Sequence, residues 1–326
     1  MINFRFHVVS LIAIFLALAL GVVVGAGVID RGVVNTLNDR LDKVETKSDR
    51  IQAENDALKS AQARDAQFIE GLEPFSVPGR LTSEAVAIVA VRGVDEDRVN
   101  ATVTSVQTAG GQVTGILWLE QKLALTGKDD PKTLAAAIDD PTKRGGALRA
   151  SLWRKLALRL LRPVVPESGT DVLTVLQDAG FVEYDQVAGG LAIAQFPGRD
   201  ALTVLVVGEQ GNVPSQDVVT AAANAFTEQS LPLVVASAWA AVDKGLPRGD
   251  VFKALRASDA ARTVSTVDDL DLAQGPTTIT LVLADLTCVP AVVGHYGYGP
   301  DTVPMPAPAN SCSGLTAPTA TTASGR

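Results

Sequence analysis

Two apolar runs, AVAIVAVRG (residues 85–93) and QVTGILWL (112–119), decide the fold of the larger part of this 326-residue chain. Each has the length and composition of a buried strand, and the segment between them, DEDRVNATVTSVQTAGG, has a helical pattern that ends at glycine. The same order returns in ALTVLVVGE (201–209), PSQDVVTAAANAFTEQS and LPLVVASAW (231–239). Because strand–helix–strand units pair their strands in parallel, residues 81–299 are predicted to form a layered α/β domain with a largely parallel sheet.

Two further elements are expected near the end of this domain. Residues 249–257 have a helical pattern, and TTITLVLADL (277–286) has the pattern of one more strand. Residues 300–326 are rich in proline, alanine, threonine and serine. A segment of that composition buries too little apolar surface to fold, so it is predicted to be a disordered tail.

The N-terminus carries an uncharged, mostly apolar run over residues 8–29, VVSLIAIFLALALGVVVGAGVI. As a helix it would reach about 33 Å, enough to cross a hydrocarbon core of about 30 Å. Arg5 precedes the run without an acid, and Asp30 follows it. The positive-inside rule then places residues 1–7 in the cytoplasm and the rest of the chain outside, behind a single-pass anchor. The small residues 24–26 leave cleavage of the anchor open.

A heptad pattern follows the anchor over residues 33–70 and predicts a coiled-coil helix. Opposite charges at its flanking positions favour a parallel pair of chains, and hence a homo-oligomer. A single amphipathic helix lying on its own domain is the alternative. Residues 71–80, with two glycines and two prolines, are predicted to be a linker. The residues of the predicted seam are Leu37, Leu41, Val44, Ile51, Asn55 and Leu58.

The segment GALRASLWRKLALRLLRP (146–163) is predicted to be an amphipathic helix. Its leucines share one side, and its basic residues share the other without an acid among them. Such a helix either contacts anionic lipid or an acidic partner, or packs its leucines on the sheet. The basic residues are Arg154, Lys155, Arg159 and Arg162.

Composition and motifs exclude several classes of function. The formal net charge of −8 and the pI of about 4.9 argue against nucleic-acid binding, which needs a basic surface. The first strand is followed by RGVDED, which is acidic where a glycine-rich dinucleotide loop would hold a pyrophosphate. The sequence carries neither a phosphate-binding loop nor a nucleophile elbow. We therefore expect a protein that is not an enzyme, with no catalytic residues and no firmly implied cofactor, a copper ion being the one possible.

Few side chains after the predicted anchor are of the kinds that bind copper. Copper binds imidazole, thiolate and thioether groups, and His295, Met305, Cys288 and Cys312 are the side chains of that kind. They lie close enough in sequence for one low-coordinate copper site, but a disulfide between Cys288 and Cys312 would remove two of them. His295 lies in GHYGYGP (294–300), where the glycines suit a turn, and it could be a turn residue, a metal ligand or a base.

Four segments together resemble the actinobacterial MctB family: MINFRFHVVSLIAIFLALALGVVVG, the heptads, TVSTVDDLDLAQG (263–275) and GHYGYGP. The resemblance covers nearly the whole chain to about residue 300. It implies a role in copper transport, in efflux or resistance across the cell envelope, and an outer-membrane location. It implies no set of ligand residues. The expected partners are membrane lipid, further copies of the chain and copper; a non-transporting envelope scaffold is the alternative function.

Overall fold

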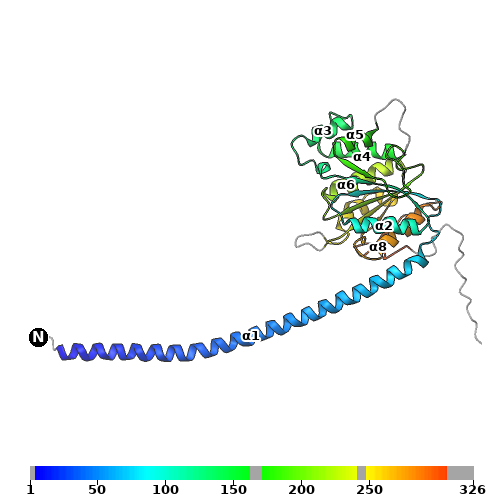
Figure 1. Ribbon diagram of the computed structural model, residues 1–326. Coiled ribbons are helices and arrows are strands. Elements are labelled where there is room, and N and C mark those ends of the chain that lie inside the picture. The colour runs from blue at the N-terminus through cyan, green and yellow to red at the C-terminus, as the bar shows by residue number, and fades with distance from the viewer. Residues whose placement is uncertain (1–3, 162–170, 241–246, 307–326) are drawn as a thin grey trace, which may run out of the picture. The chain divides into compact units, whose positions relative to one another are not determined.

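The computed structural model describes residues 4–161, 171–240 and 247–306. By its internal contacts the chain separates into two units, Met1–Asp65 and Ala66–Arg326. The second unit contains an α/β fold with a mostly parallel sheet, which confirms the predicted fold class (Figure 1). Of the predicted tail, residues 300–306 are described and pair with β7 through a bridge between Tyr296 and Val303, whereas residues 307–326 lie outside the described residues.

The chain begins with one continuous helix, α1 (Phe4–Ser76). Among the described residues, Phe4–Gly25 is the segment long and apolar enough to cross a membrane, which agrees with the predicted anchor but starts four residues earlier. The helix also runs through Gly71 and Pro74, so it ends later than the predicted linker allows. Proline removes a hydrogen bond to the preceding turn, and only two residues follow it before the helix stops.

The sheet has seven strands in the order β3-β2-β1-β4-β5-β6-β7. All neighbouring strands are parallel except β2 and β3, which pair antiparallel at one edge. The central strands are buried along almost their whole length, as continuous apolar runs predict. Their bounds are β1 (Ala85–Val91), β2 (Gln112–Leu119), β3 (Val182–Asp185), β4 (Leu202–Gly208), β5 (Leu233–Ala238), β6 (Val264–Val267) and β7 (His295–Tyr296).

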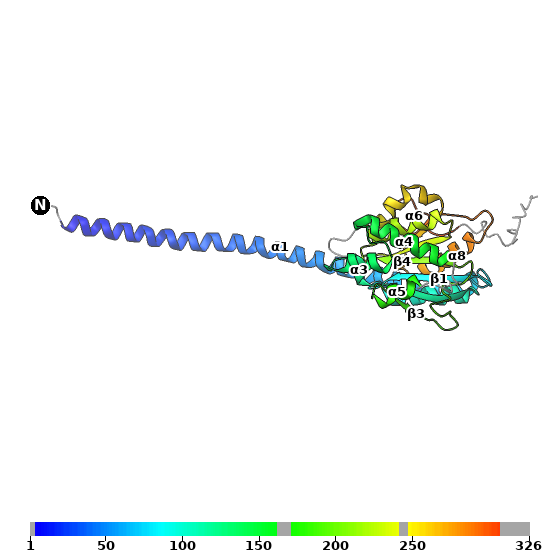
Figure 2. The same ribbon diagram turned by 90° about the horizontal axis from the view of Figure 1, so that it is seen from above.

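Helices cover both faces of the sheet. The chain moves from β1 to β2 toward one edge of the sheet and from β4 to β5 toward the other edge. Because both crossovers are right-handed, the helix of the first crossover and the helix of the second lie on opposite faces of the sheet. α2 and α8 lie against each other on one face, and α4 and α6 on the other (Figure 1, Figure 2). The helices are α2 (Glu96–Thr108), α3 (Asp130–Ala137), α4 (Gly145–Leu161), α5 (Val172–Asp178), α6 (Ser215–Glu228), α7 (Lys253–Arg256) and α8 (Gly275–Leu286). Short 3-10 turns are η1 (Gln121–Ala124), η2 (Asp250–Phe252) and η3 (Asp259–Arg262).

The strand predicted at 277–286 is wrong, because this segment is helix α8. A short apolar run rich in threonine, isoleucine and valine suits a buried strand and a buried helix equally. Pro276 in the first turn fits a helix start, and most of the helix is buried between α2 and the sheet. The sixth strand is instead Val264–Val267. It lies in one of the segments that carry the family resemblance and was not predicted as a strand.

The predicted amphipathic helix is confirmed as α4, and four of its leucines, Leu148, Leu152, Leu156 and Leu160, are buried, whereas Leu158 and Leu161 are exposed. Its basic side is not uniformly exposed as predicted. Arg159 is buried and binds Asp171 through Nε–Oδ1 at 2.6 Å and Nη2–Oδ2 at 3.1 Å. Arg154 is half-exposed and pairs with Glu228 of α6. The helix therefore packs on the sheet, while Arg162 lies outside the described residues.

Candidate functional site

The two segments at 263–275 and 294–300, far apart in sequence, lie side by side at one edge of the sheet. β6 pairs in parallel with β7, with Thr266 opposite His295. His295 therefore lies on a short strand rather than in the turn suggested by its glycines, and the turn follows it. In parallel α/β sheets the carboxyl ends of the strands form the usual ligand sites. This end of β6 and β7 is therefore the candidate site.

Asp268, directly after β6, holds the two segments together. Its carboxylate is fully buried and accepts hydrogen bonds from the backbone N–H groups of Tyr298 (2.8 Å) and Gly299 (3.1 Å). Arg256 Nη2 donates to the same carboxylate at 3.1 Å. Gly297 has φ +123°, and a Cβ there would collide with Asp268 Oδ1. The glycines are thus needed because the loop wraps closely around a buried carboxylate.

The hydrogen bonds of His295 determine which of its nitrogens carries the proton. Nδ1 lies 3.0 Å from Thr266 Oγ1, and that same hydroxyl oxygen accepts from Arg256 Nε (3.2 Å) and Nη2 (3.0 Å). With both acceptor positions occupied by Arg256, the Thr266 hydroxyl donates its own proton to Nδ1. Burial, and to a lesser extent Arg256, lowers the pKa of His295, which favours the neutral ring. From these contacts we assign the ring proton to Nε2.

This tautomer opposes the predicted role of His295 as a metal ligand. A metal needs a nitrogen lone pair, and the lone pair of His295 is at Nδ1, facing Thr266. Val303 N donates to His295 O at 3.1 Å, which brings the segment of Met305 beside β7. Met305 is exposed and Cys288 is buried, while Cys312 lies outside the described residues. The disulfide between Cys288 and Cys312 therefore stays a prediction, as does a copper site that includes Met305.

Two acidic side chains near the site, Asp271 and Asp269, differ in their contacts: Asp271 is paired with an arginine, whereas both carboxylate oxygens of Asp269 are buried without a hydrogen-bond partner among the described residues. Arg248 donates to both carboxylate oxygens of Asp271 at 2.7 and 2.6 Å, and its guanidinium lies 4.8 Å from the ring centre of Trp239. Asp269 is fully buried, and burial together with the Asp268 charge raises its pKa to about 6. Across the described residues, the His, Cys, Asp and Glu side chains form no group of three that could hold a metal ion.

A pocket of about 620 Å³ opens beside His295 at this edge. It lies between η2, α7 and the loop after β7. We call it the Arg256 pocket, and its polar lining residues are Arg248, Asp250, Lys253, Arg256, His295 and Asp301. Only His295 among them could be singled out from the sequence, because the basic residues lie 39 to 47 positions earlier and only the fold brings them close.

The place where a dinucleotide would bind in this topology is filled by the protein itself. Strand order reverses between β1 and β4, and the carboxyl ends of those strands form the usual crevice. The loop after β4 crosses it, with Asn212 N donating to Arg92 O at 2.7 Å. A space of about 160 Å³ remains there. The geometry thus agrees with the acidic loop in arguing against a dinucleotide.

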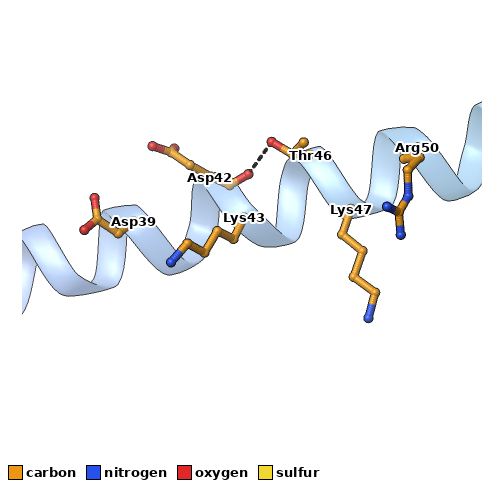
Figure 3. Close-up of a pocket in the computed structure, with 6 residues that line it drawn as sticks. All are labelled: Asp39, Asp42, Lys43, Thr46, Lys47 and Arg50. Carbon is orange, nitrogen blue, oxygen red and sulfur yellow. Dashed lines mark hydrogen bonds between the residues drawn. The ribbon is translucent and has the colours of Figure 1, made fainter.

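The predicted seam on α1 is exposed in the single chain. The side chains of Leu37, Leu41, Val44 and Leu58 are more than half exposed, and Ile51 is 44% exposed. Figure 3 shows a charged and polar stretch of the same helix, with Thr46 Oγ1 donating to Asp42 O at 2.7 Å. The side chains in that view come from one helix and project in different directions, so they do not enclose a ligand.

Comparison with known proteins gives a consistent result. The model of the family described as "Copper transport outer membrane protein, MctB" matches residues 1–306. Proteins named "Copper transporter MctB" from Mycobacterium tuberculosis and Mycobacterium bovis are 28% identical over 317 residues, covering 92% of this chain and 97% of each relative. The protein of that name from Mycobacterium leprae is 28% identical over 320 residues with the same coverage.

Proposed function

Because this chain belongs to the MctB family, whose model matches residues 1–306, we propose that it acts in copper transport across the cell envelope. The match over nearly the whole chain is the observation that carries the proposal. It includes the apolar helix segment, the heptads and both segments of the candidate site. The relatives' names describe transport rather than catalysis, and a His295 whose Nε2 carries a proton is poorly suited to act as a base.

We place the protein in the membrane through Phe4–Gly25, with the N-terminus in the cytoplasm and the α/β unit outside. The length and apolar composition of this segment support the span, and Arg5 before it supports the orientation. The family description suggests the outer membrane. Separating inner from outer membranes of cells that make the full chain, followed by immunoblotting, tests this location.

We propose that the chain pairs in parallel with a second copy through the seam on α1. The described residues hold one helix apolar enough to span a membrane, and one such helix cannot line a pore, so a transporting form requires several chains. The seam supports pairing because its exposed apolar side chains recur at heptad spacing, where a partner helix would bury them. Each buried leucine or isoleucine would contribute about 1.5–3 kcal/mol. Asn55 at the seam favours one register of a two-stranded coil.

The assembly is tested with a matched pair of variants in the full chain. Val44→Asp with Ile51→Asp places two charges in the seam, whereas Thr46→Asp with Ala53→Asp places the same charges on the outer side of the helix. We expect the first variant to be monomeric in detergent, by light scattering, and the second to remain associated. Equal association of both variants with the unchanged chain would contradict the seam.

Transport is tested in a copper-sensitive bacterial strain that lacks its own MctB protein. We expect the full chain to change cell-associated copper, measured by mass spectrometry, and to restore growth in copper, while the seam variant does neither. Unchanged copper content with every chain would refute transport. That outcome would favour a non-transporting envelope scaffold. The structure offers one argument for this alternative, because the His, Cys, Asp and Glu side chains of the described residues form no group of three that could hold a metal ion.

A separate experiment asks whether the chain binds copper directly. The full chain, reduced and in detergent, is titrated with Cu(I) against a competing chelator, beside His295→Ala. We expect His295→Ala to leave any Cu(I) binding unchanged, because the ring offers an N–H rather than a lone pair. Loss of tight binding in this variant would make His295 a ligand and contradict the assigned tautomer.

A further inference from the structure

The Arg256 pocket presents hydrogen-bond donors to whatever occupies it. It lies at the carboxyl ends of parallel strands, the usual position of ligand sites in open α/β sheets, and holds about 620 Å³. A pocket of that size accommodates a small molecule. The wall that faces it comes from η2, α7, β7 and the loop after β7, all of them within the α/β unit.

His295 contributes the first donor. Its Nδ1 accepts from the buried Thr266 hydroxyl, and the ring lines the pocket. Nε2 is therefore the nitrogen available to a ligand, and it carries the proton. Because the ring is neutral, it donates one hydrogen bond without adding a charge.

Arg256 contributes the second donor together with a positive charge. A guanidinium carries five N–H groups. Four of them are used, by Thr266 twice, by Asp268, and by Pro300 O, which Nη1 reaches at 3.1 Å. The second N–H of Nη1 has no acceptor among the described residues, and Arg256 lines the pocket. The buried Asp268 and the ring of Phe252, 5.2 Å away, fix the orientation of the guanidinium.

Lys253 supplies a mobile cation, one helical turn before Arg256 on α7. Its side chain is exposed, and it has no ion pair among the described residues. Arg248 is already satisfied by Asp271. Two rim acids, Asp250 and Asp301, oppose an anion and should keep its affinity modest.

From this arrangement of donors, we propose that the Arg256 pocket binds a small oxyanion, a carboxylate or a phosphate group. The ionised oxygens of such a group accept hydrogen bonds and do not donate, which complements His295 Nε2–H, Arg256 Nη1–H and the Lys253 ammonium. The proposal does not depend on copper transport, because its ligand is an anion rather than a metal. It also rests on an imidazole of His295 that offers the pocket an N–H instead of a lone pair.

The test uses imidazole ¹⁵N NMR of the full chain in detergent at pH 7. The chain has only two histidines, so His7 is the internal control. We expect His295 to show protonated Nε2, and its signals to shift on adding inorganic phosphate or acetate but not equimolar chloride, while those of His7 stay fixed. A response to phosphate alone or to acetate alone identifies the oxyanion. A protonated Nδ1, or no shift with either anion, overturns the proposal.

Variants locate the binding. Lys253→Gln should weaken the anion that binds by roughly tenfold, the loss expected for one charge-assisted hydrogen bond. Lys132→Gln, an exposed lysine on α3, should leave the affinity unchanged. Asp301→Asn should strengthen binding by removing a rim charge, and asparagine tolerates the positive φ of 59° at that position. Equal affinity in Lys253→Gln, Asp301→Asn and the unchanged chain would place the anion elsewhere and refute the proposal.

Discussion

The Asp268→Asn substitution tests the central contact of the candidate site. Asp268 is fully buried, and its carboxylate accepts from two backbone N–H groups and from Arg256, whose side chain is 10% exposed. Asparagine has nearly the same shape and keeps one oxygen for the backbone N–H groups of Tyr298 and Gly299. Its amide nitrogen, however, is a donor that faces the donor Arg256 Nη2. The substitution therefore removes the ion pair with little change in packing.

The expected loss follows from the burial of both charges. Breaking a buried ion pair by neutralising one partner costs about 3–5 kcal/mol, because the other charge stays buried without compensation. In a unit of this size, each 1 kcal/mol lowers the melting temperature by about 2–4 °C. We therefore expect the melting temperature of the α/β unit to fall by roughly 6–20 °C.

Tryptophan fluorescence of the full chain measures this transition. All three tryptophans, at 118, 153 and 239, lie in the α/β unit, so unfolding of α1 does not contribute directly. Asp259→Asn is the matched control, because its ion pair with Arg262 is largely exposed and contributes at most about 1 kcal/mol. An Asp268→Asn transition within 2 °C or so of the control would refute the reasoning that this ion pair holds the site together.

Three further substitutions test neighbouring arguments. Asp171→Ala should lower the unfolding free energy of the α/β unit, measured in urea, by about 3–5 kcal/mol, because it leaves the buried charge of Arg159 without its partner. A loss below about 1 kcal/mol would contradict a buried ion pair. Burial raises the pKa of Asp285 to about 6, so the folded state binds its proton more tightly and the unfolding free energy should fall as pH rises from about 4 to 6. Asp285→Asn should flatten that decline, by on the order of 2–3 kcal/mol in urea titrations, and an equal slope in both chains would count against it. Thr266→Val removes the donor to Nδ1, so the ¹⁵N spectrum of His295 should lose its preference for protonated Nε2; an unchanged spectrum would refute the assigned tautomer.

The four central strands of the sheet could be predicted from the sequence with nearly their observed bounds. β2 was predicted with its observed bounds, and β1, β4 and β5 within one or two residues, because parallel strands buried on both faces are continuous apolar runs between polar turns. α8 was misassigned for the same reason. It is buried on most sides, so it lacks the polar face that distinguishes a helix from a strand.

The basic side of α4 shows a second limit of sequence patterns. The prediction that Arg159 lies on the side away from the leucines was wrong, because a residue seven positions after Leu152 and eleven after Leu148 returns to the leucine side of a helix. Spacing also could not reveal that Asp171, from the start of α5, and three backbone carbonyls near Phe196 enclose the guanidinium. A helical wheel describes one helix, whereas burial depends on the segments that pack around it.

The candidate site could be predicted only in part, and the missing part concerns chemistry rather than position. His295 and its glycines could be identified from the sequence, but the residue type alone does not show which ring nitrogen has the lone pair. That is decided by Arg256, whose two bonds to the Thr266 hydroxyl force this group to donate to Nδ1. Arg256 is 39 residues away in sequence and is held in place by Asp268. The metal-ligand role of His295 stays a prediction, but the contacts of its Nδ1 argue against it, and they are the same contacts from which we propose that the ring donates to an anion.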